Sequence, residues 1–145
     1  MEMLMKYHLT DLVDQLVLHE GLKLKPYRCT ADKLTIGVGR NIEDRGITED
    51  EARYLLQTDI DIAEKELLAA KPVVDMLDAV RQRVLVDMAF NIGVPRLLKF
   101  KLMWAAIEAG AFIDASIQML DSLWARQVGK RAHSLSEAMR IGEWN

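Results

Sequence analysis

The chain has 145 residues, half of them hydrophobic and 28% charged, which suffices for one folded domain and argues against intrinsic disorder. The net charge of −3 argues against a dedicated nucleic-acid-binding protein. The single cysteine excludes an intramolecular disulfide framework and a multi-thiolate zinc site, and the three histidines lack helical metal-ligand spacing. The sequence therefore predicts neither a metal nor a cofactor.

Signals for a membrane or for export are also missing from the sequence. No run of residues approaches the roughly 20 apolar residues that a transmembrane helix requires. Residues 1–8 contain neither the apolar core nor the cleavage site of a signal peptide. We therefore expect no stable membrane insertion and no self-directed export.

Residues 9–20 predict an amphipathic helix that ends at a carboxylate. Its apolar positions follow the helical repeat at Leu9, Leu12, Val13, Leu16 and Val17. Thr10 or Asp11 is expected to cap its N-terminus, and Gly21 to end it. Glu20 then lies on the last turn, where the negative end of the helix dipole favours the protonated carboxyl group that a general acid needs near neutral pH. The alternative interpretation is a solvated glutamate at a helix end.

Two short strands are expected over residues 26–30 and 33–38, joined by a turn at 31–32. Because side chains alternate along a strand, Thr35 faces the same side as the two glycines that follow it. A hydroxyl flanked by glycines leaves space for a substrate or a water molecule. The alternative is an ordinary strand residue with high β propensity. Residues 44–46 are expected to form a turn.

The remainder of the chain predicts helices. Residues 48–51 form a capping box, and the helix that it opens runs to about Ala70. A central buried helix is expected over residues 73–92, with a break near Asp78 and a stop at Gly93. Shorter helices are expected at residues 100–109, 112–121, 123–128 and 134–140. The chain is therefore expected to be α+β and mostly α.

The order of the polar residues resembles a known family. Glu20, Cys29 and Thr35 are separated by eight and by five residues within HEGLKLKPYRCTADKLTIGVGRN. This signature resembles the phage-type lysozymes of the T-even endolysin family, glycoside hydrolase family 24 muramidases, in the branch that carries Glu, Cys and Thr. The further segments that resemble the family are residues 47–52, 71–73, 77–81 and 90–93, Trp124, Arg131 and residues 142–144. The resemblance covers nearly the whole chain.

The resemblance implies a lysozyme-like fold in a single domain of residues 1–145. A small β-hairpin lobe of about residues 21–50 is linked by a long helix of about residues 48–70 to a larger helical lobe of about residues 72–145. The N-terminal helix of about residues 9–20 is grouped with the helical lobe. The substrate cleft is expected between the two lobes.

The resemblance also implies hydrolysis of the β-1,4 bond between N-acetylmuramic acid and N-acetylglucosamine in peptidoglycan. Glu20 is expected to act as the general acid. Cys29 and Thr35 are expected to position the attacking water, which gives inversion; a thioether intermediate with retention and lytic transglycosylase chemistry are the alternatives. The residues expected to contact the substrate are Phe90, Asn91, Gln118 and Arg131. The alternative function is a non-catalytic peptidoglycan-binding protein.

Cys29 decides between the mechanisms. A thiol with a pKa of about 8.5 is mostly neutral at neutral pH and is a poor general base. An aspartate would carry a full negative charge at this position, whereas a cysteine carries one only where its thiolate is stabilised. Arg28 and Lys33 are the nearby candidates to stabilise it.

The chain departs from the T-even lysozyme at four places. Cys29 replaces an acidic residue, and Arg40 replaces a histidine. The segment between Gly39 and Gly46 is shorter, so we expect a reduced small lobe. Met103 stands where the family has a small polar contact to the substrate, and the substitution puts that contact in doubt.

The expected partners and location are those of an endolysin. Peptidoglycan glycan strands are the expected partner of a monomeric enzyme. We expect accumulation in the cytoplasm of a bacterial host before lysis, release through a separately encoded holin without a physical complex, and action on periplasmic peptidoglycan.

Overall fold

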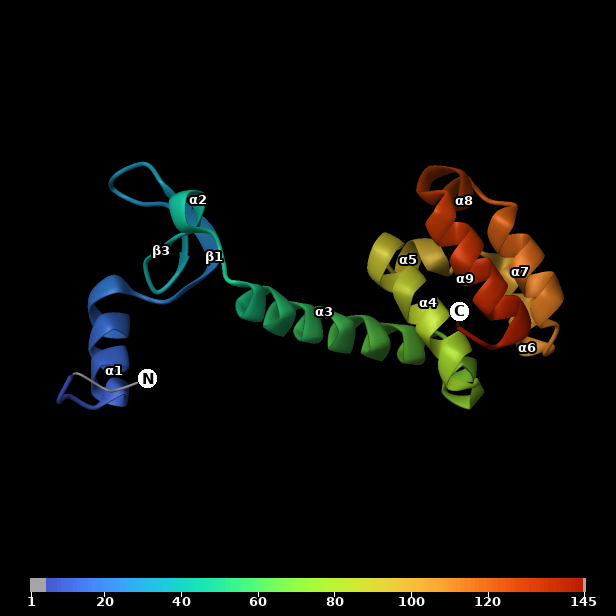
Figure 1. Cartoon of the computed structure of the whole chain (residues 1–145), viewed down its shortest axis with the longest axis horizontal. Coiled ribbons are helices and arrows are strands. Elements are labelled where there is room, and N and C mark those ends of the chain that lie inside the picture. Colours follow the sequence, from blue (N-terminus) through green and yellow to red (C-terminus); the bar gives the residue numbers. More distant parts are fainter. Residues whose placement is uncertain (1–4, 145) are drawn as a thin grey trace. The chain divides into compact units, whose positions relative to one another are not determined.

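The computed structural model describes residues 5–144 (Figure 1). Residues 1–4, part of the segment in which we expect no signal peptide, and Asn145 lie outside the described residues. The structure is mostly helical with one small antiparallel sheet, which confirms the predicted α+β class. Within residues 5–144, every helix is too short or too polar to cross a membrane. Contacts divide the chain into two compact units, Met1–Arg53 and Tyr54–Asn145.

The first unit begins with α1 (Leu9–Glu20), which has the predicted bounds. The predicted N-cap is wrong: His8 occupies that position without a side-chain hydrogen bond, and Thr10 already lies inside the helix. Gly21 ends α1 with a positive φ of 80°. No residue of α1 is buried: Leu9, Val13 and Leu16 of its apolar stripe are exposed, and Leu12 and Val17 are half-buried. The grouping of this helix with the helical lobe stays a prediction.

The sheet has three strands in the order β1-β2-β3. Their bounds are Lys23–Arg28 for β1, Leu34–Gly37 for β2 and Arg40–Asn41 for β3. The predicted first strand is wrong at both ends, because pairing starts at Lys23 and Cys29 already belongs to the connection. Pro26 does not prevent this pairing, since β1 is an edge strand. The third strand was missed because two residues show no alternation.

The one-turn helix α2 (Ile42–Arg45) replaces the predicted turn at 44–46. Asn41 caps it, accepting a hydrogen bond from the Asp44 backbone N–H at 3.0 Å. Gly46 ends it with a positive φ of 65°. A single turn of helix is too short to show a hydrophobic period, and the sequence pattern therefore indicates only that the chain changes direction here.

The long helix α3 (Glu49–Ala70) begins with the predicted capping box. The Thr48 backbone N–H donates to Glu51 at 2.8 Å, and the Glu51 N–H donates to the Thr48 hydroxyl at 3.1 Å. These reciprocal bonds satisfy two donors that have no partner within the helix. The helix starts in the first unit and continues in the second, where Leu67 enters the core.

The second unit contains the 3₁₀ helix η1 and six α-helices among its described residues, besides α3. Their bounds are η1 Pro72–Met76, α4 Ala79–Ile92, α5 Val94–Leu97, α6 Lys101–Glu108, α7 Phe112–Leu120, α8 Leu123–Val128 and α9 Lys130–Ile141. The predicted break near Asp78 is confirmed, because its carboxylate caps α4. Helix α5 was not predicted, and the predicted start of the last helix at 134 is wrong, because α9 begins at Lys130.

Long, flexible apolar side chains fill the core of the second unit. Helix α7 packs against α6 and α9, and α9 also packs against α4. Four methionines, each at most 1% exposed, lie among these helices: Met88, Met103, Met119 and Met139. Their unbranched thioethers adapt to irregular gaps between helices. Such side chains suit a core in which several short helices meet.

One arginine ties two helices of this unit together. Arg81 Nε donates to the Met139 carbonyl at 2.7 Å, and Nη2 donates to the Arg140 carbonyl at 3.1 Å. Nη1 also donates to the Asp78 carboxylate at 3.1 Å. The two carbonyls lie in the last turn of α9, where helix carbonyls lack partners along the helix. Gly142 leaves room for the guanidinium, since a Cβ there would lie 2.9 Å from Nη1.

Arg81→Met is expected to destabilise the second unit by about 2 kcal/mol, because two helix-end carbonyls lose a charged donor. Thermal unfolding followed by circular dichroism measures this loss as a lower Tm. Lys65→Met is the matched control, since it removes an exposed ion pair with Asp61 on α3 and should leave Tm nearly unchanged. Equal losses in the two variants would contradict the capping role of Arg81.

Candidate active site

The carboxyl group of Glu20 lies against the backbone of Gly39. Glu20 is the last residue of α1, and Gly39 lies in the turn between β2 and β3. A Cβ on Gly39 would be 2.9 Å from Glu20 Oε2, closer than real side chains approach. Gly39 also has a positive φ of 68°, which favours glycine. The turn therefore requires glycine both for its own conformation and for the position of the Glu20 carboxyl group.

Cys29 and Thr35 share one peptide carbonyl. The backbone N–H of Cys29 donates to the Lys33 carbonyl at 3.0 Å, and the Thr35 hydroxyl donates to the same oxygen at 2.8 Å. Thr35 is buried. Beside Gly37, by contrast, a Cβ would meet nothing within 4 Å. The predicted space beside the Thr35 hydroxyl stays a prediction.

The pKa of the Cys29 thiol is lowered by hydrogen bonds that favour the thiolate. The backbone of Lys33 contributes most, followed by the backbone of Ala31 and the Thr35 hydroxyl. The Thr35 hydroxyl, which donates to the Lys33 carbonyl, is thus also one of the groups that lower the pKa of the Cys29 thiol.

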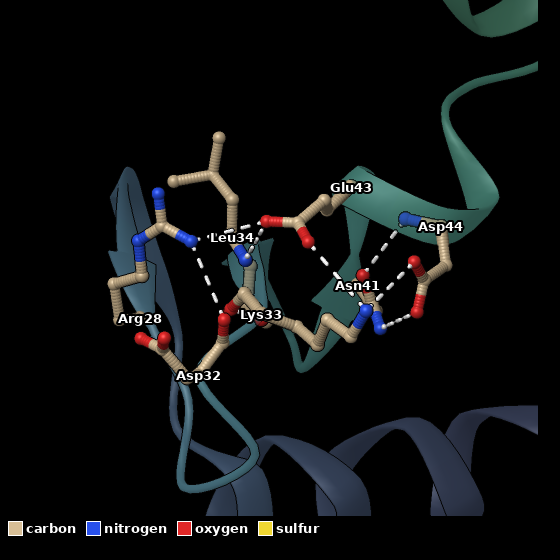
Figure 2. Close-up of polar contacts among 8 residues, drawn as sticks. Arg28, Asp32, Lys33, Leu34, Asn41, Glu43 and Asp44 are labelled. Atoms are coloured by element: carbon tan, nitrogen blue, oxygen red, sulfur yellow. Dashed lines mark hydrogen bonds and ion pairs between the residues drawn. The ribbon is translucent and has the colours of Figure 1, made fainter.

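The cations near Cys29 are paired with carboxylates of α2 (Figure 2). Arg28 Nη1 lies 3.1 Å from Glu43 Oε1, and Lys33 Nζ lies 3.2 Å from Asp44 Oδ1 and 3.6 Å from Glu43 Oε2. The hydrogen bond and charge of Asp44, with a smaller contribution from Glu43, raise the pKa of Lys33. The lowered pKa of the Cys29 thiol comes from hydrogen bonds and not from these two side-chain charges.

Arg40 binds the first turn of α3. Its two terminal nitrogens donate to the two oxygens of Glu51 at 2.6 and 2.5 Å, the bidentate geometry that makes arginine pairs strong. The Arg40 hydrogen bond, followed by the Thr48 backbone N–H, lowers the pKa of Glu51 to about 2. Within the first unit, β3 is thereby tied to the capping box of α3.

In the second unit, Phe90 and Arg131 line one pocket of about 680 Å³. Arg131 is paired there with Asp87, whose Oδ1 lies 2.8 Å from Nε and 2.7 Å from Nη2. Apolar side chains of α3, η1 and α4 supply much of the remaining wall. The pocket therefore combines an apolar surface with an arginine whose charge is already compensated.

Asn91 and Gln118 lie apart from that pocket. The side-chain oxygen of Asn91 accepts a hydrogen bond from Trp124 Nε1 at 2.9 Å, which leaves the Asn91 amide N–H groups to donate. The Trp124 ring meets Phe100 edge-on, with centroids 6.2 Å apart. Phe100 and Gln118 line a second pocket of about 320 Å³. The structure thus brings Phe90 together with Arg131, and links Asn91 to the second pocket through two aromatic rings.

The contact between Trp124 and Asn91 escaped prediction: the buried Trp124 indole orients the Asn91 amide. Met103 is buried and lines the second pocket, so a polar side chain is absent at that position. A hydrogen bond between residues 33 positions apart leaves no local signal in a sequence.

A mostly helical α+β chain with a glutamate, a cysteine and a threonine around a small sheet is typical of a lysozyme-like hydrolase. The phage lysozyme family matches residues 17–140, and the chain belongs to this family. It is a lysozyme-like muramidase, a glycoside hydrolase whose substrate is peptidoglycan. The predicted family, fold and enzyme class are thereby confirmed.

Relatives of several kinds share this similarity. The chain is 25% identical over 165 aligned positions to "Probable T4-type lysozyme 1" of Dictyostelium discoideum, covering 94% of the chain and 97% of the relative. It is 30% identical over 117 positions to "Endolysin" of Acyrthosiphon pisum secondary endosymbiont phage 1, covering 78% and 77%. It is 28% identical over 160 positions to "Pre-baseplate central spike protein Gp5" of Enterobacteria phage T4, covering 91% of the chain and 28% of that protein.

Gly39→Ala is expected to displace the Glu20 carboxyl group and to lower peptidoglycan hydrolysis by at least about tenfold, because reacting groups tolerate little misplacement. Gly37→Ala is the matched control: its φ of 71° imposes similar backbone strain, but its Cβ meets nothing within 4 Å. Both variants should lose similar stability in thermal unfolding. Equal losses of hydrolysis would show that strain, and not contact with Glu20, explains the effect.

Proposed function

We propose that the protein cleaves the β-1,4 bond between N-acetylmuramic acid and N-acetylglucosamine, with Glu20 as the general acid. The observation that carries the proposal is the contact of the Glu20 carboxyl group with Gly39, in the turn that follows the strand bearing Thr35. Membership of the phage lysozyme family supports the substrate class. Glu20 and Gly39 are both exposed, so the carboxyl group is accessible to the bridging oxygen of a polymer.

The proposed reaction uses one proton from the protein and one water molecule. Glu20 donates its proton to the glycosidic oxygen while the C1–O bond breaks, so the leaving sugar departs as an alcohol. The water oxygen bonds to C1 from the opposite face and gives up one proton. Uptake of a proton by the Glu20 carboxylate then completes the cycle, with one water consumed for each bond broken.

Cys29 and Thr35 are proposed to position this water. When the thiol is neutral, the Thr35 proton is donated to the Lys33 carbonyl, and the hydroxyl oxygen remains available to accept from water. A water held by polar atoms in this way is oriented without a strong base. Attack from the face opposite the leaving group inverts the configuration at C1.

The lowered pKa of Cys29 favours a second mechanism. The thiolate is the nucleophilic form of cysteine. Attack of the sulfur on C1 would form a thioether, and its hydrolysis by water would then restore the thiol and give retention. The two mechanisms therefore differ in the anomer that is first released.

Four residues of the second unit are proposed to contact the glycan: Phe90, Asn91, Gln118 and Arg131. The half-exposed ring of Phe90 offers a flat surface to a sugar. The Asn91 amide is oriented by Trp124, so its N–H groups have a defined direction. The guanidinium of Arg131 in this pocket is already paired with Asp87. Because this pairing compensates its charge, we expect Arg131 to bind neutral sugar groups in preference to anions.

We propose an endolysin role in a phage or prophage. The similarity to a phage protein named endolysin supports this role. The proposed route is accumulation of a monomer in the host cytoplasm, passage through a separately encoded holin, and hydrolysis of periplasmic peptidoglycan that lyses the host.

Digestion of purified Gram-negative sacculi tests the proposed chemistry. The parent is expected to release muropeptides with reducing ends, and Glu20→Gln to lose about 10²- to 10⁴-fold in turnover because the acid is removed. Cys29→Asp is expected to stay active, since a carboxylate also orients water. Comparable turnover in Glu20→Gln would remove Glu20 from the acid role. Binding without cleavage by the parent, or 1,6-anhydro ends detected by mass spectrometry, would contradict hydrolysis.

The stereochemistry of the product separates the two mechanisms. Proton NMR spectra recorded immediately after cleavage of a soluble glycan should show the α anomer first, because single displacement inverts the β bond. Initial β product would support the thioether route instead. Cys29→Ser is the matched variant, since a hydroxyl keeps the polarity but is a far weaker nucleophile than a thiolate.

A further inference from the structure

The peptide group between Lys33 and Leu34 is bound on both of its sides. Its carbonyl accepts from the Cys29 N–H at 3.0 Å and from the Thr35 hydroxyl at 2.8 Å. Its N–H, which belongs to Leu34, donates to Glu43 Oε1 at 3.3 Å (Figure 2). Because a peptide group is planar and resists rotation, the direction of its N–H also sets the direction of its carbonyl.

The Glu43 carboxylate takes the place of a missing strand residue. β3 pairs Ile36 with Arg40 and Thr35 with Asn41, and then the chain turns into α2. Continued pairing would place a backbone acceptor at the Leu34 N–H. The α2 turn supplies the Glu43 side chain at that position instead.

Two cations also lie beside the Glu43 carboxylate. Arg28 Nη1 contacts Oε1 at 3.1 Å, and the same nitrogen lies 3.3 Å from the Asp32 carbonyl in the connection between β1 and β2. Lys33 Nζ lies 3.6 Å from the other oxygen. The Glu43 carboxylate therefore contacts Arg28 at the end of β1 and Lys33 just before β2, and Cys29 lies between these two residues.

These contacts are too exposed to contribute much stability. The side chain of Glu43 is 39% exposed and that of Arg28 is 60% exposed, and ion pairs of this kind are worth little in solution. The hydrogen bond from the Leu34 N–H to Glu43 differs from these ion pairs, because it acts on the peptide group whose carbonyl accepts from the Cys29 N–H and from the Thr35 hydroxyl. A small rotation of that group would move both side chains.

We propose that Glu43 is a positioning residue for glycan hydrolysis, which acts by holding the Lys33–Leu34 peptide group in the orientation that places Cys29 and Thr35. This inference rests on the proposed roles of Cys29 and Thr35. It concerns a residue outside the Glu, Cys and Thr signature, on the one-turn helix that follows β3.

Amide hydrogen exchange measured by NMR on the full chain tests the contact without reference to activity. The Leu34 amide is expected to exchange at least about tenfold faster in Glu43→Ala, because its acceptor is removed. Glu43→Gln keeps an acceptor oxygen and should retain most of the protection. Lys33→Met removes an ion-pair partner but leaves the backbone intact, and it should also retain it. An unchanged Leu34 rate in Glu43→Ala would overturn the proposal.

Sacculus digestion with the same variants tests the positioning role. Glu43→Ala is expected to lower kcat about tenfold with KM within about twofold, whereas Glu43→Gln and Lys33→Met keep kcat near that of the parent. Glu49→Ala is the control for loss of an exposed ion pair in the same unit and should be neutral. Faster exchange with unchanged kcat would overturn the positioning role. An inactive parent would overturn the proposed function and this role together, while the exchange rates would still report on the contact.

Discussion

The close approach of a side-chain carboxyl group to a backbone turn is the constraint on which the candidate site depends. The Glu20 carboxyl group lies against the turn between β2 and β3 at Gly39, where a Cβ would lie 2.9 Å from Oε2. The last turn of α1 and this turn must therefore keep their relative position within the first unit, and a positive φ at both Gly21 and Gly39 permits it. A methyl group at that point would lie too close to a carboxylate oxygen. The constraint on residue 39 is therefore steric and does not depend on the charge of Glu20.

The two units are stabilised by different kinds of interaction. Among residues 5–53, Thr35 alone is buried, and the contacts that define this part of the chain are hydrogen bonds and ion pairs, such as the Arg40–Glu51 pair. The second unit has an extensive apolar core that spans α3 to α9. Polar contacts depend steeply on direction, which suits a segment that must orient a thiol and a hydroxyl. Apolar packing is non-directional and suits the helices that carry the proposed glycan contacts.

Sequence patterns predicted the long elements well because these repeat over many residues. The bounds of α1 and the capping box of α3 follow from spacing and from local side-chain chemistry alone. β3, α2 and α5 escaped prediction, since two to four residues are too few to show a period. In the candidate site, the order of Glu20, Cys29 and Thr35 was readable from the sequence. The contact of Glu20 with Gly39 and the bond between Trp124 and Asn91 depend on tertiary structure, and no local pattern encodes them.

Oxidation of the buried methionines can be used to measure how often the core of the second unit opens. Oxidation adds one oxygen to a thioether and makes it polar, and it requires access to the sulfur. Met88, Met103, Met119 and Met139 are shielded in the folded unit, whereas Met76 is 87% exposed. Under mild peroxide, sulfoxide would form promptly at Met76 and only during transient opening at the other four. Mass spectrometry of the peptides would compare the oxidation rates of the four buried methionines with that of Met76. The ratio reports how often the helical core opens.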